Sequence, residues 1–167
     1  MKRVMIIGCG GAGKSTLARK LGEKTGLSVV HLDQIWWEPG NWQHIEKSEF
    51  DERLAEELRK PQWILDGNFN RTIEARLAVC DTVIYLDYPR IVCLKNWLGR
   101  VIQNWGHARA DMAEGCAEWF DPEMAKWIWK FNKQNRSRYY ALLEKTENKN
   151  IVILKSRGQA EKFLESI

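Results

Sequence analysis

Eight residues near the start of the chain constrain its fold more than any other segment. Residues 8–15 read GCGGAGKS, which has the spacing G-x-x-x-x-G-K-[ST]. The apolar run Val4–Ile7 precedes them and predicts a strand that is covered on both faces. Apolar residues at helical spacing follow at Leu17, Ala18 and Leu21. A strand, a glycine-rich turn and a helix in this order predict a phosphate-binding loop.

The residue types in this loop suit a chain of phosphates. Glycines let the backbone bend so that successive amide N–H groups converge on phosphate oxygens, and the next helix adds the positive end of its dipole. Lys14 is expected to reach the β- and γ-phosphates of a nucleotide, and Ser15 to ligate Mg²⁺. The alternative is a glycine-rich turn packed tightly before a helix, which needs no Lys-Ser pair. The predicted nucleotide contacts in this loop are Gly8, Gly10, Gly11, Ala12, Gly13, Lys14, Ser15 and Thr16.

Predicted strands alternate with predicted helices along the rest of the chain. Apolar and β-branched runs mark strands at 28–32, 63–65, 82–86 and 151–154. With the first strand, this alternation predicts an α/β fold: a five-stranded parallel sheet with right-handed crossovers and helices on both faces, in three layers. Ligands of such sheets bind beyond the carboxyl ends of the strands.

Several helices have marked ends or faces. Ser48 is expected to cap a helix that Pro61 ends, and Pro89 to open the next one. Ser156 and Gln159 fit a capping box before the last helix. The helix after Pro89 carries an apolar stripe, predicted to face the core, of Ile91, Leu94, Leu98, Val101, Ile102 and Trp105.

Length and composition indicate one ordinary domain, residues 1–167. The hydrophobic share of 44% and the charged share of 29% argue against a disordered chain. The net charge of +4 suits phosphate-bearing small molecules and is too weak to indicate nucleic acid. No apolar run resembles a signal peptide or approaches the ~20 residues that cross a bilayer. The four cysteines lack metal or redox spacing. We therefore expect a cytoplasmic domain with neither a membrane nor a nucleic-acid partner.

Two acidic positions follow predicted strands. Asp66 ends one of them before Gly67 and Asn68, where its carboxylate is placed to hold Mg²⁺ through water. Asp33 lies across the cleft from the phosphate-binding loop, where it is expected to bind an acceptor hydroxyl and take its proton. A turn or helix cap is the alternative for Asp33. Trp37 is a candidate to stack on a base or sugar, with core packing as the alternative.

The chain resembles the adenylate-kinase-like family of small P-loop kinases. The resemblance rests on the phosphate-binding loop, the run Ile64–Asn68, a strand ending at Asp87-Tyr88-Pro89, and an arginine-bearing segment without periodicity at 106–120. Within this family the chain looks most like a bacterial group labelled DNA-topology modulation proteins, with Asp33–Trp37 and Arg109–Gly115 among the matching stretches.

The resemblance implies an ATP- and Mg²⁺-dependent kinase of a small molecule. A lid, at about 106–120, would bring Arg109 over the transferring phosphoryl group, and Arg100 is a second candidate for this role. A solvated loop position for Arg109 and a helix-surface position for Arg100 are the alternatives. The loop that contains Arg157 would line the adenine. Shikimate and gluconate kinases have a carboxylate placed similarly to Asp33.

The acceptor arm, at about 33–60, departs from the family pattern. From Thr25 to Ile45 there is no Lys or Arg, whereas adenylate kinase grips its acceptor phosphate there with an arginine. A hydroxyl compound or nucleoside is therefore expected over a nucleoside monophosphate. Arg71 and Arg76 are candidates to bind an acceptor anion, with Arg76 favoured. The full set of predicted acceptor contacts is Asp33, Trp37, Asp66, Gly67, Asn68, Arg71 and Arg76.

The group label raises an alternative function. This is a DNA-binding protein that changes supercoiling and uses nucleotide as a switch. The sequence has no helix-turn-helix spacing, zinc finger or basic tail, and its acidic residues are interspersed throughout. The kinase is the favoured interpretation, and the sequence leaves the acceptor, the choice between ATP and GTP and the number of subunits open.

Overall fold

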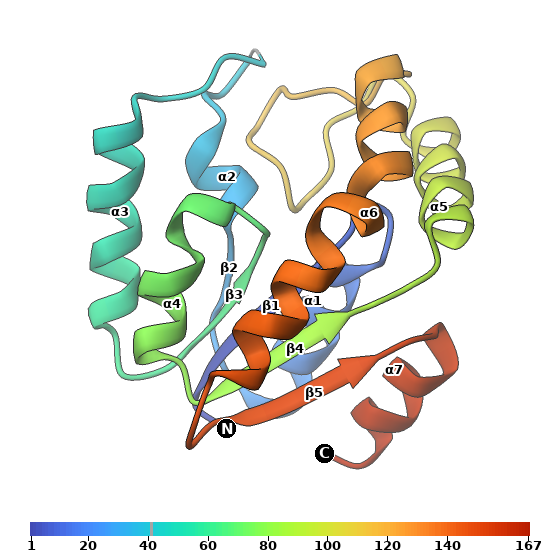
Figure 1. Cartoon of the computed structure of the whole chain (residues 1–167). Helices are drawn as coiled ribbons and strands as arrows, with labels where there is room; N and C mark the ends of the chain where they lie inside the picture. The colour runs from blue at the N-terminus through green and yellow to red at the C-terminus, as the bar shows by residue number, and fades with distance from the viewer. Residues whose placement is uncertain (41) are drawn as a thin grey trace.

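A computed structural model of the protein describes residues 1–40 and 42–167 (Figure 1). Asn41, within the predicted acceptor arm, lies outside the described residues. Five strands pair in parallel in the order β2-β3-β1-β4-β5. They are β1 (Arg3–Gly8), β2 (Val29–His31), β3 (Trp63–Asp66), β4 (Thr82–Leu86) and β5 (Asn150–Leu154). The predicted five-stranded parallel sheet is thus confirmed.

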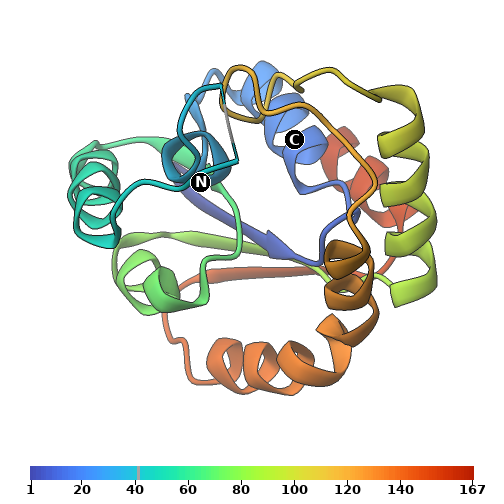
Figure 2. The same ribbon diagram turned by 90° about the horizontal axis from the view of Figure 1, so that it is seen from above.

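Helices cover both faces of this sheet. Seen from above, α1 and α7 lie on one face and α4 and α6 on the other (Figure 2), which completes the predicted three layers. The helices are α1 (Lys14–Thr25), α2 (Leu32–Trp36), α3 (Lys47–Arg59), α4 (Ile73–Val79), α5 (Arg90–Gln103), α6 (Pro122–Glu144) and α7 (Arg157–Glu165), with a 3₁₀ turn η1 (Asn70–Thr72) before α4. Ser156 caps α7 by accepting from the Gln159 N–H, as predicted.

The central strands form the core because both of their faces are covered. Every residue of β3 and β4 is buried, as is Val4–Gly8 of β1. Continuous apolar runs are typical of parallel strands between two helix layers. Among the largest fully buried side chains are Trp63 on β3 and Trp97 on α5, and burial of such a side chain contributes roughly 1.5–3 kcal/mol or more.

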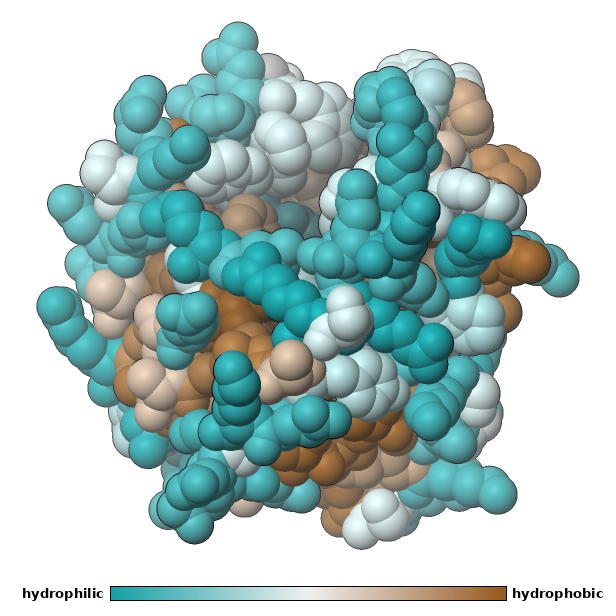
Figure 3. Space-filling view, in the orientation of Figure 1, coloured by the Kyte–Doolittle hydropathy of each residue, from teal (hydrophilic) through white to brown (hydrophobic). Residues whose placement is uncertain are grey.

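Helix α5 presents only part of the predicted stripe to the core: Val101 is buried and Leu94 packs against the core, as predicted. Cys93, Trp97 and Val101 are buried, whereas Ile91 is 66% and Ile102 is 74% exposed. Apolar residues are visible on the surface over α5 (Figure 3). The predicted stripe omitted Trp97, whose large indole buries more area than an isoleucine. It also missed that the phosphate-binding loop packs closely against this face, at Cys93.

Helix α3 begins at another residue than predicted, and the segment 106–120 is the one in which the sequence shows no periodicity. Helix α3 begins at Lys47 after Glu46, so Ser48 lies inside the helix and does not cap it. Burial of Phe50 and Leu54 fixes the helix without a side-chain cap. The segment 106–120 contains no helix or strand, only isolated bridges such as Ala108 with Ala117. In the part of the chain that the structure describes, no helix has the length and apolar character needed to span a membrane.

Candidate active site

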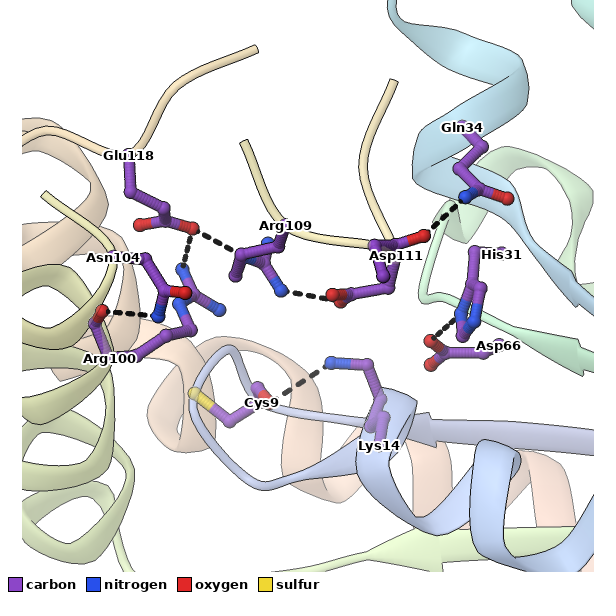
Figure 4. Close-up of polar contacts among 11 residues, drawn as sticks. Cys9, Lys14, His31, Gln34, Asp66, Arg100, Asn104, Arg109, Asp111 and Glu118 are labelled. Carbon is purple, nitrogen blue, oxygen red and sulfur yellow. Dashed lines mark hydrogen bonds and ion pairs between the residues drawn. The ribbon is translucent and has the colours of Figure 1, made fainter. Parts of the chain in front are cut away.

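The phosphate-binding loop joins β1 to α1 at the carboxyl end of the sheet. Gly13 precedes α1 with φ 87°, a left-handed conformation that glycine adopts readily. A Cβ atom at Gly11, whose φ is 77°, would lie 2.1 Å from the carbonyl oxygen of Cys93 on α5. The loop therefore requires glycine for its shape and for its packing. Lys14 folds over the loop, and its Nζ donates to the Cys9 carbonyl at 3.1 Å (Figure 4).

Asn68 fastens this loop to the turn after β3. Its side-chain amide accepts from the Gly8 N–H at 3.0 Å and donates to the Gly8 carbonyl at 2.7 Å. These two bonds extend the pairing of the sheet past the end of β3. Asn68 was predicted to contact the acceptor, and it lines the cavity described next. The position of the phosphate-binding loop is thus tied to the acceptor side of the site.

One cavity of about 1400 Å³ lies beyond the carboxyl ends of the strands. It is lined by phosphate-loop residues, by the acceptor arm, by the segment 106–120 and by the start of α7. The predicted site residues that the structure brings together there are Gly10, Gly11, Ala12, Gly13, Lys14, Ser15, Thr16, Asp33, Trp37, Gly67, Asn68, Arg100, Arg109 and Arg157. Those that do not line it are Gly8, Asp66, Arg71 and Arg76.

Two carboxylates lie on the acceptor side at different depths. Asp66, at the end of β3, is 4% exposed, and its Oδ2 is 2.8 Å from His31 Nδ1. His31 lines the cavity, whereas Asp66 does not. Asp33, in α2, faces the cavity itself. Burial raises the pKa of Asp33, the nearby Asp66 raises it further, and Lys14 lowers it.

The structure corrects the prediction that Arg76 binds an acceptor anion. Arg76 is fully buried, and its guanidinium donates to the carbonyls of Gly67 at 2.8 Å, of Asn68, and of Phe69 at 3.2 Å. Burial lowers the pKa of Arg76 to about 10. Three carbonyls around one guanidinium compensate its lost hydration, so Arg76 holds the loop after β3.

Arg71, the other candidate for the acceptor anion, points elsewhere. It is exposed on η1 and pairs with Asp51 of α3 at 2.5 Å. Hydrogen bonding to Asp51 raises the pKa of Arg71. Since Arg71 does not line the cavity, its side chain contributes to the surface between η1 and α3 and not to the site.

Two arginines converge on one carboxylate in the predicted lid. Arg109 Nε donates to Glu118 Oε1 at 2.6 Å, and Arg100 Nη2 lies 3.2 Å from the same oxygen. Glu118 is 4% exposed. Burial lowers the pKa of Arg100, and the charge of Arg109 lowers it further. Arg109 does not have the solvated loop position that was the alternative for it, and Arg100, on α5, is only partly exposed. The sequence analysis missed Glu118, which is an isolated acidic residue in a segment without periodicity.

Asp111 brings a further carboxylate from the same segment into the cavity. It pairs with Arg109, and it lines the cavity together with Ser15 of the phosphate-binding loop. Burial disfavours its charge, but Arg109 and Ser15 outweigh this, so the pKa of Asp111 is lowered. Figure 4 shows Asp111 on the side of the lid that faces Lys14. Only the local run Arg-Ala-Asp hints at this residue in the sequence.

The tip of the predicted lid contacts the predicted acceptor arm. Gln34 Nε2 donates to the Ala110 carbonyl at 2.7 Å, the Gly40 N–H donates to the Glu114 carbonyl at 2.6 Å, and Trp42 Nε1 donates to the Ala117 carbonyl at 3.0 Å. A small apolar cluster of Met112, Ala113 and Cys116 packs against Trp37. Trp37 therefore packs in this cluster, which was the alternative for it, and it also lines the cavity. Its stacking on a base or sugar stays a prediction.

The oxygen donors at the cavity suit a hard cation. Ser15 offers a hydroxyl, and Asp33 and Asp111 offer carboxylates. Mg²⁺ in phosphate-binding sites is held by one or two such groups together with water and phosphate oxygens. Within residues 1–40 and 42–167 no group of three or more His, Cys, Asp or Glu is arranged to hold a metal ion. The donor set fits Mg²⁺ that arrives with a nucleotide.

The fold is the α/β fold of P-loop kinases, as comparison with solved structures shows. Shikimate kinase from Acinetobacter baumannii in complex with shikimate superposes with a TM-score of 0.61 at 17% identity, over 99% of this chain and 90% of that one. Deoxyadenosine kinase from M. mycoides gives 0.53 at 15% identity, over 98% and 97%. At these identities the likeness establishes the fold alone.

Sequence comparison gives a weaker signal. No family model matches the chain. The adenylate kinase of Thermotoga neapolitana is 29% identical over 110 residues, which are 62% of this chain. The chain thereby spans 47% of that relative, about half of its length.

Proposed function

We propose that this chain is a kinase that transfers the γ-phosphoryl group of ATP, bound with Mg²⁺, to a hydroxyl of a small molecule. The observation that carries the proposal is that Lys14, Asp33 and Arg109 line one cavity beyond the carboxyl ends of the strands. A phosphate-binding cation, a carboxylate base and a mobile arginine are the groups that phosphoryl transfer uses. The names of the similar proteins, which are kinases of shikimate, deoxyadenosine and adenylate, agree with this.

The nucleotide would occupy the phosphate-binding loop. Lys14 would exchange the Cys9 carbonyl for phosphate oxygens, and the amides of Gly11–Ser15 would donate to them. Arg157, at the start of α7, lines the same cavity and is proposed to lie beside the base. Mg²⁺, when bound, neutralises charge on the phosphates, and Ser15 is its proposed protein ligand.

Asp33 is the proposed acceptor base. It would bind the acceptor hydroxyl and take its proton as the oxygen attacks phosphorus. The raised pKa of Asp33 brings it closer to the working pH, which favours proton transfer. Lid closure over this site would keep water away from the phosphoryl group.

The charges around Asp33 favour an acceptor without a phosphate. Arg109, which pairs with Asp111 and Glu118, is proposed to bind the transferring phosphoryl group and not a phosphate of the acceptor. Arg76 is fully buried and bound to carbonyls. A phosphate placed beside Asp33 would therefore meet carboxylates. A neutral hydroxyl compound or nucleoside therefore fits better than a nucleoside monophosphate. The base or sugar ring of such an acceptor would stack on Trp37, which lines the cavity.

Arg109 and Arg100 are proposed to stabilise the transferring phosphoryl group. Both lie in or beside the lid and share the Glu118 carboxylate. Phosphoryl oxygens would replace this carboxylate as their partner, so no new cation needs to enter the site. Arginines that act in this way contribute roughly 1,000- to 100,000-fold in rate in other phosphoryl-transfer enzymes.

A screen of hydroxyl metabolites and nucleosides for ADP release tests the proposal, with Lys14→Ala as the blank. We expect one chemical class to release ADP with the wild-type protein alone. ADP release that is equal in both proteins would contradict the proposal.

Filter binding of DNA at increasing salt tests the alternative, a nucleotide-switched protein that modulates DNA topology. This alternative predicts a steep negative slope of the logarithm of DNA affinity against the logarithm of salt concentration. A cytoplasmic location, where ATP and free thiols coexist, is part of the kinase proposal.

A further inference from the structure

His31 and Asp66 form a pair on the acceptor side of the cavity that the proposed reaction does not yet use. They end the neighbouring strands β2 and β3, where they are partners in the parallel register. His31 Nδ1 lies 2.8 Å from Asp66 Oδ2 (Figure 4). The two side chains are 10% and 5% exposed. Two paired strand ends therefore hold an imidazole against a carboxylate at the edge of the cavity.

The carboxylate of Asp66 has no other polar partner within residues 1–40 and 42–167. Its second oxygen, Oδ1, is buried without a hydrogen bond there. Burial of a charged group is costly when few bonds compensate it. Asp66, which was predicted to hold Mg²⁺, does not line the cavity. A buried carboxylate whose side chain keeps one bond, to His31, is expected to act through His31.

Asp66 decides which ring nitrogen of His31 carries the proton. A neutral imidazole has one N–H, and its other nitrogen accepts a hydrogen bond. An ionised carboxylate only accepts, so Nδ1 donates to Asp66 and Nε2 is left with a free lone pair. Nε2 has no hydrogen-bond partner among the described residues, and His31 lines the cavity. His31 thus offers a hydrogen-bond acceptor to a ligand.

A second hydrogen-bond acceptor lies two residues further along the chain. Asp33 lines the same cavity as His31. Leu32, between them, is fully buried, and a Cβ atom at Gly67 would lie 2.9 Å from its Cβ atom. This packing fixes the segment that carries both side chains. A ligand that satisfies His31 as well as Asp33 must therefore donate two protons, which a fully ionised phosphate does not have.

We propose that the acceptor is a polyol: one hydroxyl lies at Asp33 and is phosphorylated, and a second hydroxyl donates to His31 Nε2. This inference rests on the proposed function and narrows its acceptor to compounds with at least two hydroxyl groups. An ammonium group would pair with the Asp33 carboxylate, so a hydroxyl is the donor that suits the neutral nitrogen. Asp66 is a positioning residue, because it keeps the proton on Nδ1.

The first measurement locates the proton on His31 without any acceptor. Long-range ¹H–¹⁵N spectra of the full chain, labelled with ¹⁵N-histidine, distinguish the two tautomers at about pH 8, above the ordinary pKa of histidine. The signal that is missing in His31→Gln assigns His31 among the three histidines. We expect the Nδ1–H form in the wild type and both forms in Asp66→Asn, whose amide donates as well as accepts. A wild-type His31 with a proton on Nε2 would overturn the inference.

The second measurement compares acceptors that differ by one hydroxyl. Ribonucleosides are assayed beside deoxyribonucleosides, and sugars beside deoxy sugars that lack a hydroxyl other than the phosphorylated one. In the wild type, loss of the second hydroxyl should lower kcat/KM about 10-fold or more. His31→Leu should lower kcat/KM for the polyol by the same factor and leave the value for the deoxy analogue unchanged. Asp66→Asn is the second variant should His31→Leu not fold.

Two variants separate this contact from a structural role. His31→Gln keeps an acceptor oxygen near the position of Nε2 and should restore most of the preference for the polyol. His107→Gln changes an exposed histidine that does not line the cavity, and it should leave the preference as in the wild type.

A loss in His31→Leu that is equal for the polyol and its deoxy analogue would contradict the inference, because a structural role of His31 lowers both alike. An acceptor with a single hydroxyl would contradict it as well. Both results leave the proposed kinase standing. If no compound is phosphorylated, the proposed function fails, and the tautomer measurement alone decides whether His31 offers an acceptor nitrogen.

Discussion

The surroundings of Asp33 favour the protonated form of its carboxyl group. Burial and Asp66 raise its pKa, and Lys14 and Arg109 offset this only in part. Because the pKa of Asp33 is raised in the folded protein, its contribution to the free energy of unfolding is fully present when the pH is below the ordinary pKa of an aspartate. That stability is lost as the pH rises through the raised value. Asp33 thus destabilises the folded protein at neutral pH, as expected of a group retained for chemistry.

Asp33→Asn should therefore separate stability from activity. We expect a higher melting temperature than the wild type at pH 7, and a difference that shrinks as the pH falls toward the ordinary pKa of Asp. Phosphoryl transfer should fall roughly 100- to 10,000-fold, with nucleotide affinity kept. Thermal melts across pH and calorimetry with nucleotide measure both effects. Unchanged transfer by the pure variant counts against Asp33 as the base.

Arg76 is a buried charged residue whose role is structural. Arg76→Met removes the donor from the carbonyls of Gly67, Asn68 and Phe69 and should lower the free energy of unfolding by roughly 2–4 kcal/mol. Urea unfolding measures this. The matched control is Arg71→Ala, whose exposed pair with Asp51 should contribute less than about 1 kcal/mol. Equal losses in both variants would mean that Arg76 does not hold this loop.

At the scale of elements, the predicted lid and the predicted acceptor arm meet at two glycines. A Cβ atom at Gly115 would lie 2.7 Å from the Cα atom of Gly40, and Gly115 has a φ of 79°. This close approach lets the Gly40 N–H reach the Glu114 carbonyl at 2.6 Å. The lid segment 106–120 lies between α2 and the helices α5 and α6 (Figure 1). At these two glycines the docking is a contact of backbone with backbone, which a side chain would prevent, and the side chains of Gln34 and Trp42 add to it elsewhere.

Gly115→Val should detach the lid from the arm. We expect faster cleavage within residues 106–120 in limited proteolysis, and weaker binding of nucleotide with Mg²⁺, because Asp111 and Arg109 lose their support. Gly158→Ala is the control, since nothing lies within 4 Å of a Cβ atom there. A protease pattern identical to the wild type would show that the contact between the two glycines does not hold the lid.

At the scale of the whole molecule, local patterns predicted the scaffold. Some features depend only on neighbours in the chain, so they can be recognised in the sequence. These are the apolar runs of β1 and β4 and the spacing of Gly13, Lys14 and Ser15. The face of α5 depends on Trp97 meeting the core and on Cys93 meeting Gly11. Such contacts across the fold leave no periodic signal.

The candidate site divides in the same way. Lys14, Asp33 and Arg109 were predicted from motif or family resemblance, and all three line the cavity. His31, Asp111 and Glu118 were missed, because their importance comes from partners on other elements or from a segment without periodicity. Arg76 was misassigned since a sequence does not distinguish an arginine that binds carbonyls from one that binds a ligand.

The most direct test of the account is calorimetric titration of the full chain with ATP and Mg²⁺, beside Lys14→Ala. The account predicts saturable binding of one nucleotide per chain by the wild type, and at least a roughly 100-fold loss in the variant, since a charge-assisted phosphate contact is removed. No saturation by the wild type, or equal affinity in the two proteins, would contradict it.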